Sequence, residues 1–318
     1  MAANTFLKPE VIANASVGLL ERELVLSNLV WTNHGLDFTG AKNDTVSLRI
    51  PARTAARTLA WRANRDATDG SGDVVLDNLA EDSISVSLDT DVYSAVPVTD
   101  EEMTLDITDF GSQILDPQVR AVAAYLDNKV ASMITGATYV SPITYTVGTD
   151  DTTSPDILSK ITGARKQLNT NDVPQENRTL LVGANFEERL LNAGNLLDVS
   201  QSGSDGALRE ATIGRLRGFT VVVSNAIDPD DAYAFVPSAF ILATRAPVIP
   251  QGATFGASAS HAGYAMRWIR DYDASKLRDR SIVNAYAGTR VVLDQDVPGI
   301  PDITKTLKRA VKLTPAGA

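Results

Sequence analysis

Two acidic segments carry side chains that could bind a metal ion. The aspartates lie around a proline and around a Gly-Ser-Gly run: Asp228, Asp230 and Asp231, and Asp69 and Asp73. Carboxylate oxygens are the ligands that hard cations such as Ca²⁺ and Mg²⁺ prefer. Aspartate and glycine are also the residues that tight turns favour. We expect a structural turn at both places and no metal site.

The rest of the sequence shows no pattern that supports catalysis. It contains no cysteine and only two histidines, His34 and His261, neither of which is linked to a serine nucleophile pattern. No phosphate-binding loop, nucleophile elbow, H-E-x-x-H motif or EF-hand loop occurs. The glycine-rich run Gly252–Gly263 lacks the dinucleotide-binding spacing and is predicted to be a loop. The sequence therefore predicts a protein that is not an enzyme and has no cofactor.

Composition restricts the possible partners. The 318 residues carry a net charge of −10, which opposes tight binding to a phosphate backbone. No apolar run reaches the roughly 20 residues that cross a bilayer, and the N-terminus lacks the features of a signal peptide. We therefore expect no membrane association, and the absence of cysteine fits assembly in a reducing cytoplasm.

The most informative anomaly is a long charged loop. Segments 45–50 and 84–88 alternate apolar and polar residues and are predicted to pair as a hairpin. More than thirty residues separate them, whereas a compact domain normally tolerates loops of about 12–15 residues. The charges form a basic limb and then an acidic limb: Arg53, Arg57, Arg62 and Arg65, followed by Asp66, Asp69, Asp73, Asp77, Glu81 and Asp82.

This charge pattern has two interpretations. The limbs could neutralise each other in a solvated loop, where exposed ion pairs contribute only about 0–1 kcal/mol each. Alternatively, the loop is an arm that docks on a neighbouring subunit. The residues alone leave both interpretations open.

Helical periodicity predicts two elements in the first half of the chain. An amphipathic helix runs from Pro9 to about Asn28, and an extended arm follows to Gly40. A longer helix begins with Asp116 as its cap and Pro117 in its first turn, and it ends at Gly136. At 1.5 Å per residue this second helix spans roughly 28 Å, enough to brace a subunit.

From about residue 150 the pattern becomes α/β and then returns to strands. We expect a helix opened by Ser154-Pro155, a short helix capped by Asn185 and Glu188, and a flexible loop over 195–206. Strands are predicted at these segments: 178–182, 219–223, 232–236, 240–243, 264–272 and 282–287. Gly288 is predicted to break the chain before a last strand at 289–293.

Taken in order, these features resemble the major capsid protein of tailed bacteriophages, the Hong Kong 97 fold. Several stretches are most similar to capsid proteins of actinobacterial phages. They are Met1–Ala13, Leu115–Ala121, Gly214–Val221, Asp271–Arg280 and Gly288–Val292. None of them is a catalytic signature, so the specificity of the resemblance lies in their joint order.

The resemblance implies an α+β fold with defined regions. These are an N-terminal arm (1–43), an extended loop (44–98), a peripheral domain with a spine helix (99–149), an axial domain (150–262), peripheral return strands (263–287), and a final axial strand with a C-terminal tail (288–318). The resemblance also favours docking of the charged loop on a neighbouring subunit. Residues 44–98 contain no lysine, so we expect no Lys–Asn crosslink of the kind that some relatives form.

The implied function is to assemble as hexamers and pentamers into an icosahedral head that encloses double-stranded DNA. The implied partners are further copies of the chain, a separate scaffolding protein and a portal, and a decoration protein is compatible. Packaged DNA would touch the acidic wall only weakly. Two alternatives stand beside this one: an encapsulin-type nanocompartment shell, and a hydrolase that uses carboxylates.

Overall fold

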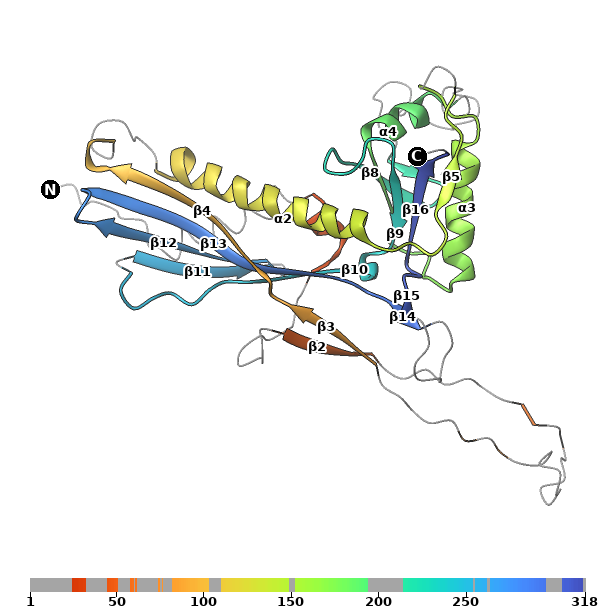
Figure 1. Ribbon diagram of the computed structural model, residues 1–318, viewed down its shortest axis with the longest axis horizontal. Coiled ribbons are helices and arrows are strands. Elements are labelled where there is room, and N and C mark those ends of the chain that lie inside the picture. The colour runs from red at the N-terminus through yellow and green to blue at the C-terminus, as the bar shows by residue number, and fades with distance from the viewer. Residues whose placement is uncertain are drawn as a thin grey trace.

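The computed structural model has two six-stranded sheets and a long helix that lies along one of them (Figure 1). The described residues are 25–32, 45–50, 58–59, 61, 74, 76, 82–102, 110–148, 152–193, 214–253, 255–261, 264–295 and 305–316. The long sheet and its helix form an elongated body, and the second sheet with two helices sits at one end of it. The mixed α+β character agrees with the sequence prediction.

The long sheet is built around β13 (Arg278–Val291), a strand of 14 residues. The strand order is β1-β10-β13-β12-β11, and β4 pairs with the other edge of β13. Its other strands are β1 (Trp31–Thr32), β4 (Thr90–Thr99), β10 (Phe240–Arg245), β11 (Phe255–His261) and β12 (Tyr264–Asp273). All pairs are antiparallel except β1 with β10. One strand thus ties together segments of the chain that are far apart in sequence.

Helix α2 (Asp116–Gly136) covers one face of this sheet and matches the predicted spine helix. Its apolar stripe, which includes Val119, Val122, Leu126 and Val130, is buried against the sheet as the three- and four-residue spacing requires. Asp116 is not the cap that we predicted. A π-helical turn, η4 (Gly111–Leu115), runs directly into α2, because proline at 117 has no N–H to donate and the preceding turn widens to accommodate it.

A buried polar network fixes α2 on the sheet. The Gln118 amide donates to the backbone carbonyl of Ser281 at 2.8 Å, and the Ser281 hydroxyl donates back to the Gln118 side-chain oxygen at 2.7 Å. The indole N–H of Trp268 donates to the same hydroxyl at 3.0 Å. Because an unpaired buried polar group costs about 1–3 kcal/mol, these contacts penalise any shift of α2 along the sheet.

The second sheet has the strand order β5-β16-β9-β6-β8-β7. Its strands are β5 (Ile143–Tyr145), β6 (Thr179–Val182), β7 (Arg215–Leu216), β8 (Phe219–Val223), β9 (Ala232–Phe235) and β16 (Ala310–Pro315), joined to the long sheet through β14 (Asp294–Gln295) and β15 (Lys305–Thr306). Helices α3 (Ile157–Thr170) and α4 (Ala184–Leu191) pack on it around a separate apolar core. The predicted helices and strands of this region are present.

The predicted hairpin at the base of the charged loop is confirmed. Strands β2 (Thr45–Ile50) and β3 (Asp82–Ser87) pair antiparallel along their whole length. They lie on the side of the long sheet that is turned away from α2, which we call the outer face (Figure 1). There Val86 is fully buried against Ile241, Ala243 and Val292.

The predicted chain break at Gly288 is wrong. Strand β13 runs through it, and residues 289–291 pair with β10 of the long sheet rather than forming a new strand in the second sheet. A Cβ added at Gly288 would lie 1.9 Å from the carbonyl oxygen of Ser87. Position 288 is therefore a glycine because the end of β3 crosses the outer face at this point. The strand that returns to the second sheet is β16 instead.

Two other local predictions are wrong. The glycine-rich run 252–263 contains strand β11 instead of forming a loop throughout, because small residues fit where Ile249 covers the strand: a Cβ on Gly256 would lie 2.8 Å from an Ile249 methyl carbon. Asn185 does not cap α4; the N-cap residue is Gly183, and the Phe186 N–H donates to the Pro229 carbonyl at 3.0 Å.

Several predictions, among them the extended arm that was expected to run to Gly40, fall largely outside the described residues. Of the predicted N-terminal helix only the end is described, where residues 27–29 form a 3-10 turn, η1 (Ser27–Leu29). The predicted loop at 195–206 and His34 also lie outside the described part of the chain.

We predict that Gly288→Ala destabilises the protein by about 1–3 kcal/mol, because the added methyl group would have to push the Ser87 backbone off the sheet. Chemical denaturation of the unassembled protein, followed by circular dichroism, would measure the change. Gly136→Ala is the matched control, since a Cβ there has no atom within 4 Å. Equal unfolding midpoints for the two variants would contradict the proposed role of Gly288.

Candidate assembly interface

The charged side chains predicted to make contacts lie in segments that the structure describes only in part. Nine of the ten are outside the described residues: Arg53, Arg57, Arg62, Arg65, Asp66, Asp69, Asp73, Asp77 and Glu81. The tenth, Asp82, is paired with Ile50 through its backbone at the start of β3. Their role in assembly therefore stays a prediction.

Four of the described side chains between β2 and β3 are apolar and exposed. Trp61 is 91% exposed and Leu76 is 88% exposed, and Leu59 and Val74 are also on the surface. Large apolar side chains gathered on one exposed segment commonly mark an interaction site. The charge pattern of the loop does not indicate these side chains, although a tryptophan in a loop without a core pattern is a usable signal of an interaction site.

The outer face of the long sheet has a polar and aromatic surface beside the hairpin base. A chain of hydrogen bonds crosses three strands, from Arg267 Nε to Asn284 Oδ1 at 3.0 Å and from Asn284 Nδ2 to Asp91 Oδ1 at 3.2 Å. Tyr93 lies opposite Asn284, and Tyr286 lies opposite Asp91. Both tyrosines are exposed, Tyr93 by 69%. These four side chains share one face because directly paired residues of antiparallel strands point the same way.

A carboxylate of α2 binds the described end of the N-terminal arm, where Leu26 and Val30 are also buried in the core that α2 lines. Asp127 accepts hydrogen bonds from the backbone N–H groups of Val25, Leu26 and Ser27 at 2.8, 3.2 and 2.9 Å, and from the Ser27 hydroxyl at 2.7 Å. Tyr264 adds a hydrogen bond to Asn28 at 2.7 Å. The carboxylate thus binds three successive backbone N–H groups and ties the described end of the arm to α2.

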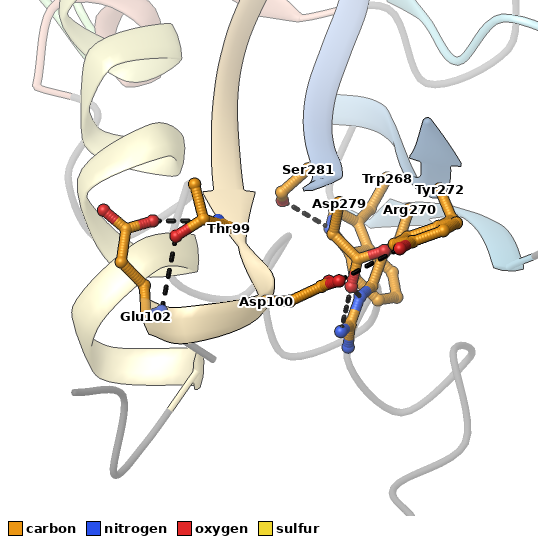
Figure 2. A network of polar contacts seen from close by, with 8 residues as sticks. All are labelled: Thr99, Asp100, Glu102, Trp268, Arg270, Tyr272, Asp279 and Ser281. Atoms are coloured by element: carbon orange, nitrogen blue, oxygen red, sulfur yellow. Dashed lines mark hydrogen bonds and ion pairs between the residues drawn. The ribbon is translucent and has the colours of Figure 1, made fainter. Parts of the chain in front are cut away.

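The far end of the long sheet is held by polar contacts between neighbouring strands (Figure 2). Arg270 donates to Asp279 at 2.8 Å, and the Tyr272 hydroxyl donates to Asp100 at 3.0 Å. The Thr99 N–H donates to the Glu102 carboxylate at 2.8 Å and holds the pKa of Glu102 below its usual value. These contacts hold together the end of the long sheet that lies far from the second sheet (Figure 1).

In the second sheet, a buried arginine joins the acidic turn to the core. Arg189 is 2% exposed and pairs with Asp230 at 2.7 Å, while it also donates to the Tyr145 hydroxyl at 2.8 Å. Burial raises the pKa of Tyr145 to about 12, although the nearby arginine opposes this shift. The phenol therefore stays protonated at neutral pH and donates to the Asp230 carbonyl at 2.6 Å.

The expected turn at residues 228–231 is confirmed, and its carboxylates have protein partners. The Asp231 N–H donates to the Asp228 carbonyl at 3.2 Å, and Lys312 pairs with the Asp231 carboxylate at 2.6 Å. Among the described residues, no group of three or more His, Asp or Glu side chains could hold a metal ion. The turn thus acts as a structural anchor between α4, β9 and β16.

In the part of the chain that the structure describes, no helix is both long enough and apolar enough to cross a membrane.

Solved structures from two phages and of a virus-like particle share this fold. One from Mycobacterium phage Che8 matches with a TM-score of 0.62 at 18% identity, covering 98% of this chain and 94% of that one. The capsid of cyanophage P-SCSP1u matches with a TM-score of 0.61 at 13% identity, covering 100% and 91%. A virus-like particle from Pyrococcus furiosus matches with a TM-score of 0.50 at 11% identity, covering 95% and 97%. The predicted capsid fold is confirmed by these matches.

No curated protein matched the sequence. A family model described as phage capsid protein matches residues 81–293, which are more than half of the chain. This span includes α2, most of the long sheet and most of the second sheet. The chain therefore belongs to the phage capsid protein family, and it is a structural protein and not an enzyme.

Proposed function

We propose that this capsid protein is the major shell subunit of a tailed phage, assembling as hexamers and pentamers into an icosahedral head around double-stranded DNA. The observation that carries the proposal is the extended loop, whose base is packed on the outer face while its apolar side chains are exposed. A segment with Trp61 and Leu76 at about 90% exposure gains from burial only if another molecule covers it.

The two sheets support a division into a peripheral and an axial domain. We assign the long sheet with α2 to the peripheral domain and the second sheet with α3 and α4 to the axial domain. This assignment moves β4, β10 and β11 into the peripheral domain, in contrast to the boundaries drawn from the sequence at residues 98 and 262. Residues 1–43 remain the arm, and the extended loop is reduced to β2, β3 and the residues between them.

Several partners follow from this role. The shell would need a separate scaffolding protein and a portal, could carry a decoration protein, and would assemble in the host cytoplasm. A net charge of −10 favours weak, non-specific contact with packaged DNA, because tight binding to phosphate requires clustered cations.

An encapsulin-type compartment is the remaining alternative, since the fold is shared with a virus-like particle from Pyrococcus furiosus. The match to the phage capsid family favours a phage head. Neighbouring genes for a portal and a terminase, rather than for a cargo enzyme, would support the phage head.

We predict that the purified protein, expressed alone or with its scaffold, sediments as large closed particles. Subunits that meet through different surfaces close into a shell only if their contacts obey point symmetry, and otherwise form open filaments. Analytical ultracentrifugation and electron microscopy would show the particles. A monomer that persists at every salt and protein concentration would overturn the proposed function.

We further predict that Arg57→Glu with Arg62→Glu leaves the subunit folded but lowers the yield of shells. The basic limb is expected to guide the loop to acidic surface on the next subunit, and complementary charge sets encounter rate and register. Circular dichroism would report the fold and sedimentation the assembly. Lys160→Glu is a control, because it also reverses a charge but lies on α3. Normal assembly of the double variant at both low and high salt would show that the basic limb is only a solvated surface.

A further inference from the structure

A cavity between α3 and the segment that leads into β16 is lined by basic and polar side chains. We propose that this cavity binds a phosphate group, held between the ammonium groups of Lys166 and Lys308. The ligand is a phosphate ester of nucleotide size or a backbone phosphate of nucleic acid, which share this chemistry. The inference goes beyond the proposed shell function and does not require it, because one copy of the chain supplies both lysines.

The cavity has two walls that are tied to each other. Its volume is about 360 Å³, within the range of about 300–1,000 Å³ that is common for small-molecule sites. One wall is α3, and the other is formed by the segments that precede β5 and β16 (Figure 1). In the second wall Leu307 is buried and pairs with Tyr139 through a β-bridge. The Asn171 amide donates to the Lys308 carbonyl at 3.1 Å and joins this wall to the end of α3. These contacts hold the shape of the cavity without a ligand.

The charge of the lining is positive. Lys166 and Lys308 are its charged members, one on each wall, and none of the described residues that line the cavity is acidic. The whole chain, by contrast, has 39 acidic and 29 basic residues. Lys160, on the same helix, pairs with Asp156 at 3.5 Å. Lys166 has no such carboxylate partner in the described part of the chain. An anion in the cavity would supply the missing counter-charge.

The end of α3 does not account for the two lysines. Its last carbonyl groups already have backbone partners. The Asn171 N–H donates to the Gln167 carbonyl at 3.1 Å, and the Val173 N–H donates to the Leu168 carbonyl at 3.0 Å. A lysine in the last turn of a helix is also favoured by the helix dipole. The dipole explains neither the cavity nor the second lysine on the facing wall.

Two ammonium groups favour phosphate over carboxylate. A phosphate monoester carries a charge of about −1.5 to −2 at neutral pH, which two lysines neutralise, whereas a carboxylate carries a single charge. Each ammonium group has three donors and binds phosphate as a compact charge. The hydroxyl of Ser141 and the amide of Gln167 add neutral donors to the same lining. A phosphate, with more acceptor oxygens than a carboxylate, can use more of these donors.

Isothermal titration calorimetry of the unassembled protein, with inorganic phosphate and with adenosine monophosphate as probes, would test the site. We expect saturable binding of both probes. Lys166→Gln and Lys308→Gln should each weaken it about tenfold, because each removes a charge-assisted hydrogen bond. The matched control is Lys160→Gln, which removes a charge from the same helix outside the cavity. It should bind both probes as the unaltered protein does.

A DNA duplex without terminal phosphates distinguishes the two sources of the phosphate group. If Lys166→Gln weakens binding of the duplex as well as of the small probes, the cavity receives a backbone phosphate. If it weakens binding of the small probes alone, the ligand is a free phosphate ester. Either result supports the phosphate site.

Three results would overturn the inference: no saturable binding of either small probe, equal affinities for Lys166→Gln and Lys160→Gln, or acetate competing as well as phosphate does. Circular dichroism would show which variants fold, and if one lysine variant does not, the other decides. Sedimentation of the same variants reports assembly separately. Failure of the phosphate site would therefore leave the proposed shell function intact, and failure to form shells would leave the phosphate site intact.

Discussion

The close approach between the Ser87 backbone and Gly288 is the contact on which the arrangement of the assembly surfaces depends. A side chain at position 288 would place a carbon 1.9 Å from the Ser87 carbonyl oxygen. Without one, β3 lies directly on β13, the Asp89 N–H donates to the Ala287 carbonyl at 3.2 Å, and Val86 enters an apolar cluster with β10. The extended loop is thereby fixed to the most extensively paired strand of the molecule.

That strand has two different faces, and each serves a different purpose. Toward α2, the sheet presents a continuous apolar core with one satisfied polar network at Gln118, Ser281 and Trp268. Toward the outside, it presents a hydrogen-bonded chain through Arg267, Asn284 and Asp91 with two exposed tyrosines. The first face specifies where the helix lies, because every buried polar group must keep its partner. On the outer face, the polar side chains already have hydrogen-bond partners. The rings of Tyr93 and Tyr286 remain exposed and are available for burial.

Periodicity predicted the elements that have one buried side. The stripe of α2 and the alternation in β2, β3 and β12 follow directly from helical and strand geometry, so the spine helix and the hairpin could be found from the sequence. Two of the predictions that failed concern glycines that another segment of the chain approaches closely. Gly288 resembles a strand breaker until Ser87 is placed on it, and β11 resembles a loop until Ile249 covers Gly256. In both cases the glycine is required by a close approach, but the segment that approaches it cannot be identified from the sequence.

The same limit, that contacts distant in sequence cannot be predicted from local patterns, applies to the candidate interface. Segregated charges identified the loop correctly as a separate element, but they directed attention to arginines and aspartates rather than to Trp61 and Leu76. The polar and aromatic surface of the outer face was not predictable, because Asp91, Tyr93 and Tyr286 come together only when β4 pairs with β13, almost two hundred residues away. Charge can bring two surfaces together and set their register, while burial of aromatic rings supplies most of the free energy that keeps them there. If the loop docks as proposed, the contact is repeated at every subunit, so a modest contribution per loop is multiplied over the whole particle.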